Sequence, residues 1–249
     1  NIEPFNEDYY KELKNIVLTN YSKLNFIEAY NSVVGLQNFC MRMHSRGHTE
    51  YMNELFSLME FTLKNGFYTS IKGGDFVPQH FKNYVIVGTN LKKFEWTENF
   101  IKVYVKKLSP QNRENAYNFS MAKVLFGKKD FEKALWFISR VSYQDLYYKL
   151  EVRNNTLLIY YELEMFSEAF DLMESYKKFI QNNKVINPAL RNRHLFFIKI
   201  INDLLKIKIS GNTKKIRQVE KEIKNSENNL NTSWLLIKLE ELTLQLERN

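Results

Sequence analysis

Lys129-Asp130-Phe131-Glu132-Lys133-Ala134-Leu135 joins two stretches in which apolar residues recur every three to four positions. A similar segment, Met165-Phe166-Ser167-Glu168-Ala169-Phe170, follows, and its Ala169 lies 35 residues after Ala134 (169 − 134). A weaker copy, Glu95-Trp96-Thr97-Glu98-Asn99-Phe100, places Asn99 another 35 residues earlier (134 − 99). The fragment Asn25–Tyr30 has the same local shape. A period of this length is typical of proteins built from repeated helix pairs.

The repeated segment resembles the turn and second-helix start of a tetratricopeptide repeat, a family whose period is about 34 residues. In that family a small residue packs between helices just after an aromatic and a charged pair, and Ala134 and Ala169 match it. The preceding helix carries Met121, Ala122 and Leu125 where the family places Leu, Gly or Ala, and Tyr. The resemblance is best over residues 80–182.

The chain also departs from the family. Asn118 and Arg153 replace the aromatic that opens the first helix of a repeat, and a closing Pro occurs only in the weak copy, as Pro110. The resemblance implies an all-α fold of antiparallel helix pairs, stacked as a tetratricopeptide-like right-handed superhelix. It also implies a non-catalytic scaffold that binds a protein or peptide on its concave face. A non-repetitive helical bundle is the alternative fold.

Helical periodicity runs through nearly the whole chain and predicts a single helical repeat domain, 1–249. Its parts are N-terminal helices (1–65), a loop containing Gly and Pro (66–78), the best-matching repeats (79–182), and C-terminal helices with a terminal cap (183–249). The predicted helices span 6–21, 26–43, a third from a cap at Thr49 to Gly66, 79–90, 96–108, 111–127, 131–141, 144–163, 166–182, 188–209, 213–226 and 232–247.

Two of these helices have a predicted face of distinct chemistry, one apolar and one charged. In the first, Tyr9, Leu13, Ile16 and Val17 share one apolar face. In the last, Lys238, Glu240 and Glu241 form a charged outer face, as the terminal cap of a repeat array requires.

Composition agrees with an all-α protein that has no intrachain disulfide. The 249 residues include only 8 Gly and 4 Pro, too few for the many tight turns of an all-β fold. Cys40 is the single cysteine, so no intrachain disulfide can form. No apolar run approaches the roughly 20 residues of a membrane span. We therefore expect a cytoplasmic protein.

Candidate catalytic and metal-binding residues are few. Cys40, His44 and His48 follow a four-residue spacing that would suit zinc on a continuous helix, but Gly47 interrupts it and no second Cys exists. His80 and His194 are isolated in sequence and are expected to be surface or capping residues. No phosphate-binding fingerprint occurs. We predict no catalytic residue, no metal and no cofactor; an enzyme with an unrecognised site remains an alternative, as does a structural segment of a larger assembly.

The resemblance also suggests which residues would line a binding groove, because the first helix of each repeat faces the concave surface. On these helices lie Asn115, Asn118, Asn154, Asn155 and Tyr161. Their amides could hold the backbone of a bound peptide through paired hydrogen bonds, and an aromatic side chain could anchor it.

A second candidate surface is basic. The net charge is +8, and basic residues gather late in the chain, among them Arg191, Arg193, Lys214, Lys215, Arg217 and Lys221. Such a stripe could follow a phosphate backbone, so nucleic-acid binding is the alternative function. The competing interpretation is a solvated face of amphipathic helices, since Ile216, Val219 and Ile223 alternate with these residues.

Overall fold

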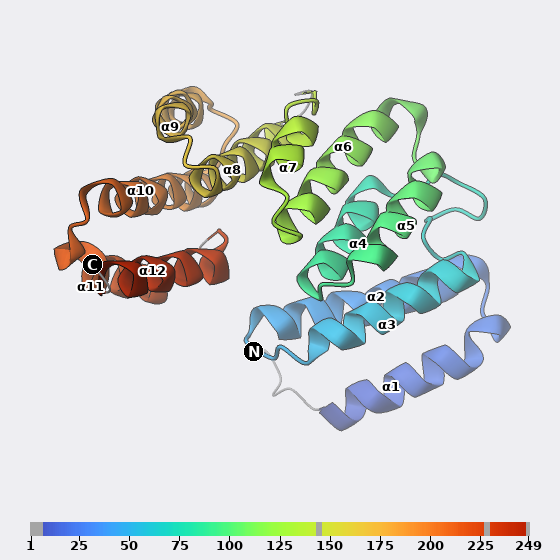
Figure 1. Cartoon of the computed structure of the whole chain (residues 1–249). Helices are drawn as coiled ribbons and strands as arrows, with labels where there is room; N and C mark the ends of the chain where they lie inside the picture. The colour runs from blue at the N-terminus through green and yellow to red at the C-terminus, as the bar shows by residue number, and fades with distance from the viewer. Residues whose placement is uncertain (1–6, 143–145, 227–229, 248–249) are drawn as a thin grey trace. The chain divides into compact units, whose positions relative to one another are not determined.

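The computed structural model describes residues 7–142, 146–226 and 230–247, and over these residues the chain is all-α with no strand. This confirms the all-α class that the sequence predicts. The sequence predicts one domain, whereas the contacts between residues divide the chain into two compact units, 1–142 and 143–249. Each unit has its own helices and its own buried residues (Figure 1). None of the described helices is long and apolar enough to cross a bilayer.

Unit 1 contains seven α-helices among its described residues, with 3-10 turns after two of them. They are α1 (Glu7–Asn20), α2 (Phe26–Ser45), α3 (Tyr51–Asn65), α4 (Pro78–Asn90), α5 (Phe94–Tyr104), α6 (Pro110–Gly127) and α7 (Phe131–Ile138), with η1 (Tyr21–Lys23) and η2 (Val105–Lys107).

Unit 2 contains five α-helices and one 3-10 turn among its described residues. They are α8 (Leu146–Glu162), α9 (Phe166–Asn182), α10 (Pro188–Ser210), η3 (Thr213–Lys215), α11 (Ile216–Asn225) and α12 (Thr232–Glu247). Residues 144 and 145, where the predicted helix 144–163 begins, lie outside the described residues.

Local signals explain why the helices begin and end where the periodicity predicts. Asn25 caps α2 through two reciprocal hydrogen bonds. Its side-chain oxygen accepts from the backbone amide of Glu28, and the Glu28 carboxylate accepts from the backbone amide of Asn25. Gly66 ends α3 with φ +75°, a left-handed conformation that glycine adopts without steric cost. The predicted cap at Thr49 is wrong: the cap position is Glu50, which makes no side-chain capping hydrogen bond.

Three helical hairpins share one turn geometry: α4–α5, α6–α7 and α8–α9. Lys92, Lys129 and Glu164 each have φ between +57° and +64°. In each turn the amide after this residue donates to a carbonyl five positions back, at 2.9 Å (Lys93 to Gly88, Asp130 to Leu125, Met165 to Tyr160). The same backbone solution therefore closes all three hairpins, and a phenylalanine begins the second helix of each: Phe94, Phe131 and Phe166.

The small residue of each hairpin lies three positions after that phenylalanine. Ala134 and Ala169 are fully buried, as predicted, and Ala29 in α2 occupies the same position after Phe26. In the weak copy the buried residue is Thr97, whereas Asn99 is exposed. The predicted assignment of Asn99 to this position is wrong, and the spacing to Ala134 is 37 residues (134 − 97) instead of 35.

Glycines allow close approach where these hairpins pack. A Cβ on Gly88 of α4 would lie 2.3 Å from Oγ1 of Thr97 in α5. A Cβ on Gly127, at the end of α6, would lie 2.8 Å from Cγ2 of Thr89 and 2.9 Å from a ring carbon of Phe94. The α4–α5 and α6–α7 hairpins therefore pack side by side in unit 1 without room for another methyl group (Figure 1).

The segment between α3 and α4 contributes to the core of unit 1. Phe76 is buried, its amide donates to the Lys107 carbonyl at 2.7 Å, and its ring packs edge-on against Phe81 and Tyr84. This fixes the C-terminal end of the predicted loop 66–78 on the α4–α5 hairpin. The predicted start of that hairpin's first helix, residue 79, agrees with Pro78 within one position.

Candidate functional site

The residues predicted to line a binding groove lie on α6 and α8, in different units. On α6, the Asn115 side chain is partly exposed and binds the backbone of Ser142, accepting from its amide at 2.7 Å and donating to its carbonyl at 3.3 Å. Asn118 is buried. Asn115 therefore fixes the end of unit 1, and Asn118 lies inside it.

The three predicted residues of α8 also have partners within their own unit. Asn154 and Tyr161 are buried, and the side-chain amide of Asn155 donates to the backbone carbonyl of Glu151, one turn earlier, at 2.7 Å. A partner at the surface reaches Asn115 and Asn155 only, because the other three side chains are enclosed by protein atoms.

Asn154 belongs to a buried polar cluster that connects α8, α9 and α10. The Tyr176 hydroxyl lies 3.0 Å from Oδ1 of Asn154, 3.1 Å from the Leu150 carbonyl and 2.7 Å from Nδ1 of His194. His194 is only 3% exposed, so the prediction that it is a surface or capping residue is wrong. Burial, together with the nearby Arg193 charge, lowers its pKa to about 4, and the imidazole is neutral at pH 7. This enclosed cluster joins three helices and is not open to a substrate.

Tyr161 packs against Trp234 of a second buried cluster, which no sequence pattern indicates. The Glu162 carboxylate accepts from Lys238 at 2.9 Å and from the Trp234 indole at 2.8 Å, and both charged side chains are 11% exposed. Burial alone would lower the pKa of Lys238, but hydrogen bonds to Glu241 and Glu162 outweigh it and raise that pKa. The prediction that Lys238 faces outward is therefore wrong. The pair joins α8 to α12 across 76 residues (238 − 162), a separation at which sequence periodicity carries no signal.

Metal and thiol chemistry find no support in the described residues, which contain no group of three His, Cys, Asp or Glu placed to hold a metal ion. Cys40 is fully buried in α2, and its sulfur lies 3.1 Å from the Tyr10 hydroxyl. Burial raises the pKa of its thiol to about 11, so the thiolate needed for nucleophilic or ligand chemistry is scarce at neutral pH.

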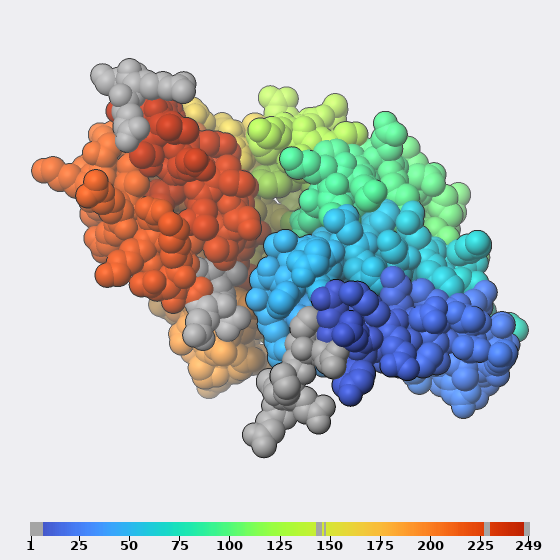
Figure 2. Space-filling view, turned by 90° about the horizontal axis from the view of Figure 1, so that it is seen from below, coloured from blue at the N-terminus to red at the C-terminus, as the bar shows by residue number. Residues whose placement is uncertain are grey.

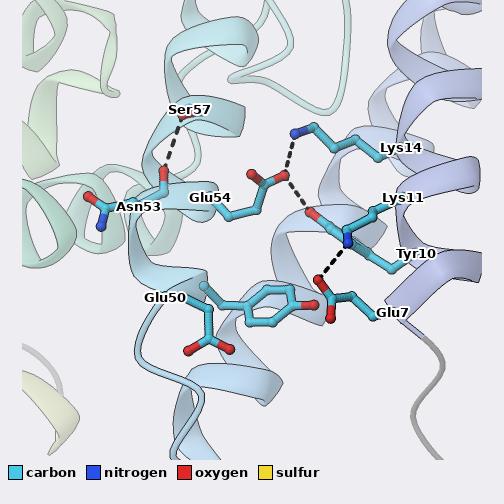
Figure 3. A pocket seen from close by; sticks show the side chains of 9 residues that line it. Glu7, Tyr10, Lys11, Lys14, Glu50, Asn53, Glu54 and Ser57 are labelled. Carbon is cyan, nitrogen blue, oxygen red and sulfur yellow. Dashed lines mark hydrogen bonds and ion pairs between the residues drawn. The ribbon is translucent and has the colours of Figure 1, made fainter.

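A groove of about 360 Å³ lies between α1 and α3 (Figure 3). Glu54 extends from α3 toward α1, where its carboxylate accepts from the Tyr10 hydroxyl at 2.8 Å and from Lys14 at 2.6 Å. Glu7 and Lys11 pair beside it at 2.8 Å. The acid in the centre of the groove thus already has two donors. These two contacts hold α3 against α1.

Another side of α1 presents apolar side chains to solvent. Tyr9, Leu13 and Ile16 are 71%, 54% and 50% exposed, and among the four residues predicted to share one apolar face only Val17 is buried. Tyr10 takes the core position instead, stacking on Phe39 of α2 at 4.6 Å. In the space-filling view α1 lies along the surface of unit 1 (Figure 2). The helix therefore has a second apolar stripe that unit 1 does not cover.

The six basic residues predicted as a patch separate into two groups. Arg191 is partly buried and donates to the carbonyls of Asn183 and Ile186 at 3.1 and 3.4 Å, so it holds the loop before α10. Arg193, also partly exposed, lies on the same helix. Lys214, Lys215, Arg217 and Lys221, on η3 and α11, are exposed.

No protein-family model, no curated protein and no solved structure matches this chain. Fold and site geometry are therefore the grounds on which its function is proposed.

Proposed function

We propose that this chain is a non-catalytic, tetratricopeptide-like helical repeat protein that binds another protein, and that the outer face of α1 takes part in binding. The observation that carries the proposal is the exposed apolar stripe of Tyr9, Leu13 and Ile16. The three hairpins with one turn geometry support the repeat arrangement, and the buried partners of the polar clusters support a role without catalysis.

The spacing of the stripe indicates the shape of its partner. Steps of four and three residues place Tyr9, Leu13 and Ile16 on one side of two helical turns. Contiguous apolar side chains in water are typical of interaction sites, and a helix with the same spacing packs well against such a stripe. We therefore propose that the occupant is an amphipathic helical segment of a partner protein.

The charges around the stripe indicate the partner's polar edge. Asp8 and Glu12 each precede a stripe residue by one position and so border one side of it. Over residues 7–20 there are three acidic residues and two lysines, and both lysines pair with acids at the groove on the other side of α1, Lys11 with Glu7 and Lys14 with Glu54. This locally acidic surface is complementary to lysines or arginines flanking the apolar face of the partner helix.

The test is capture of partners from a native, nuclease-treated lysate with the full-length chain and two variants. L13E/I16E places charge in the stripe, and V103E places charge at another half-exposed apolar residue, on α5. Burying half of a Leu and half of an Ile contributes roughly 2 kcal/mol, so we expect L13E/I16E to lower partner affinity at least about 30-fold. V103E should retain it. Equal capture by all three proteins would refute a role for the stripe.

A further inference from the structure

The net positive charge of this chain is concentrated in one segment of unit 2. Residues 184–226 contain eleven Lys and Arg but three Asp and Glu, a net charge of +8. All other residues together contain 25 basic and 25 acidic residues (36 − 11 and 28 − 3) and are neutral in sum. A uniform bias toward lysine would have spread this excess along the chain, so the segment is distinct in its electrostatics.

The acids within the segment that lie on α11 already have partners. Glu220 pairs with Lys224 at 2.5 Å, and Glu222 pairs with Lys199 of α10. Four other cations on η3 and α11 make no ion pair among the described residues: Lys214, Lys215, Arg217 and Lys221, here called the basic face. Their charge is therefore not neutralised locally.

The helix holds the basic face outward. Ile216, Val219 and Ile223 are buried, and they occupy the side of α11 opposite Arg217 and Lys221. From Lys214 to Lys221 is seven residues, or about 10 Å along a helix. Duplex DNA carries about one phosphate per 1.7 Å of its axis, so a stretch of this length faces several phosphates.

We propose that the basic face binds the phosphate backbone of a nucleic acid without reading its base sequence. Lysine and arginine contacts to phosphate position a protein on a duplex but carry no sequence information. The apolar side chains of α11 are buried, so it offers neither an anchor for a protein interface, where lysine is depleted, nor a face for insertion into a lipid bilayer. No aromatic residue occurs between 214 and 225 to stack on a base.

The experiment is fluorescence anisotropy of a labelled 20-base-pair DNA duplex titrated with the full-length chain from 50 to 200 mM salt. Four phosphate contacts predict that affinity falls about 150-fold over this range. The variant K214Q/K215Q/R217Q/K221Q should lose most of the low-salt affinity and most of this salt dependence. The control K72Q/K102Q/K106Q/K107Q removes four exposed lysines from unit 1 and should bind like the unaltered chain.

Two further probes separate this surface from other anionic partners. The chain is also titrated, under the same conditions, into phosphatidylserine vesicles and, separately, into polyglutamate. Binding to either probe as tight as binding to DNA would overturn the assignment to nucleic acid. Equal loss of DNA binding in the two quadruple variants would overturn the assignment to the basic face. L13E/I16E should leave DNA binding unchanged, so failure of the proposed protein-binding stripe is distinguishable from failure of this inference.

Discussion

Substituting Gly88 by Ala measures how closely α4 and α5 approach. The added Cβ would lie 2.3 Å from Oγ1 of Thr97, which is fully buried and donates to the Lys93 carbonyl at 2.8 Å. Forcing an extra carbon into a packed site costs about 1–3 kcal/mol, and Ala in place of a helical Gly recovers about 1 kcal/mol. We expect G88A to lower the free energy of unfolding by about 1 kcal/mol.

The same substitution should have the opposite sign when Thr97 is Ala. Without the hydroxyl, the nearest atoms to the new Cβ are 3.4 Å away, a tight but permitted contact, and the helix gain of about 1 kcal/mol remains. The two substitutions should therefore couple by about 2 kcal/mol in a double-mutant cycle measured by urea denaturation. T97V, which keeps the side-chain volume, should leave G88A destabilising. A coupling energy near zero would refute the close packing that places Thr97 at the repeat position.

Three other predictions concern the buried groups. The pKa of His194 is lower in the folded than in the unfolded state, so between pH 6.5 and about 4 the unfolded state binds one more proton. The free energy of unfolding should therefore decrease as the pH is lowered through this range, by up to about 1.4 kcal/mol per pH unit. H194Q should lose that dependence in urea titrations measured at several pH values. E162Q leaves Lys238 with only the half-exposed Glu241 as a counter-charge and should cost about 1.5 kcal/mol, the contribution of one hydrogen bond to a charged group, whereas E174Q, in an ion pair 69% exposed on both sides, should change stability by less than about 0.5 kcal/mol. Cys40, buried with its pKa raised to about 11, should react with a thiol reagent at pH 8 only as fast as unit 1 opens, which adding urea would accelerate.

Helix positions could be predicted closely from sequence because their signals are local. Pro110 and Pro188 begin helices where their fixed backbone angle is tolerated, and Gly66 ends one by adopting a left-handed conformation. The repeat was also visible, because Ala134 and Ala169 are both buried small residues in equivalent turns. These features depend on residues within one or two helical turns of each other.

The errors arose where a neighbouring helix decides the outcome. In the weak copy Thr97 and Asn99 are both small, and only contact with Gly88 on α4 distinguishes them. His194 and Lys238 are polar and read as surface residues, yet Tyr176 and Glu162 on other helices provide buried partners. The relevant pairings join residues 9 to 76 positions apart, and the periodicity of one helix contains no information about them.

The candidate surfaces were predicted unevenly for the same reason. The basic face was visible as an excess of basic over acidic residues, and η3 and α11 expose the four residues that the sequence singled out there. The apolar face of α1 was also visible as a pattern, but the pattern does not distinguish the buried Val17 from the exposed Tyr9, Leu13 and Ile16. Which of two adjacent apolar stripes packs inward depends on Tyr10 stacking on Phe39, a contact between α1 and α2.

The most direct test of the proposed function is hydrogen exchange of the full-length chain, alone and with a protein partner captured from lysate. Protein binding through the outer face of α1 predicts slower amide exchange in residues 7–20 when the partner is bound, and no such protection with L13E/I16E. Protection confined to other helices, with α1 exchanging at its free rate, would contradict the account.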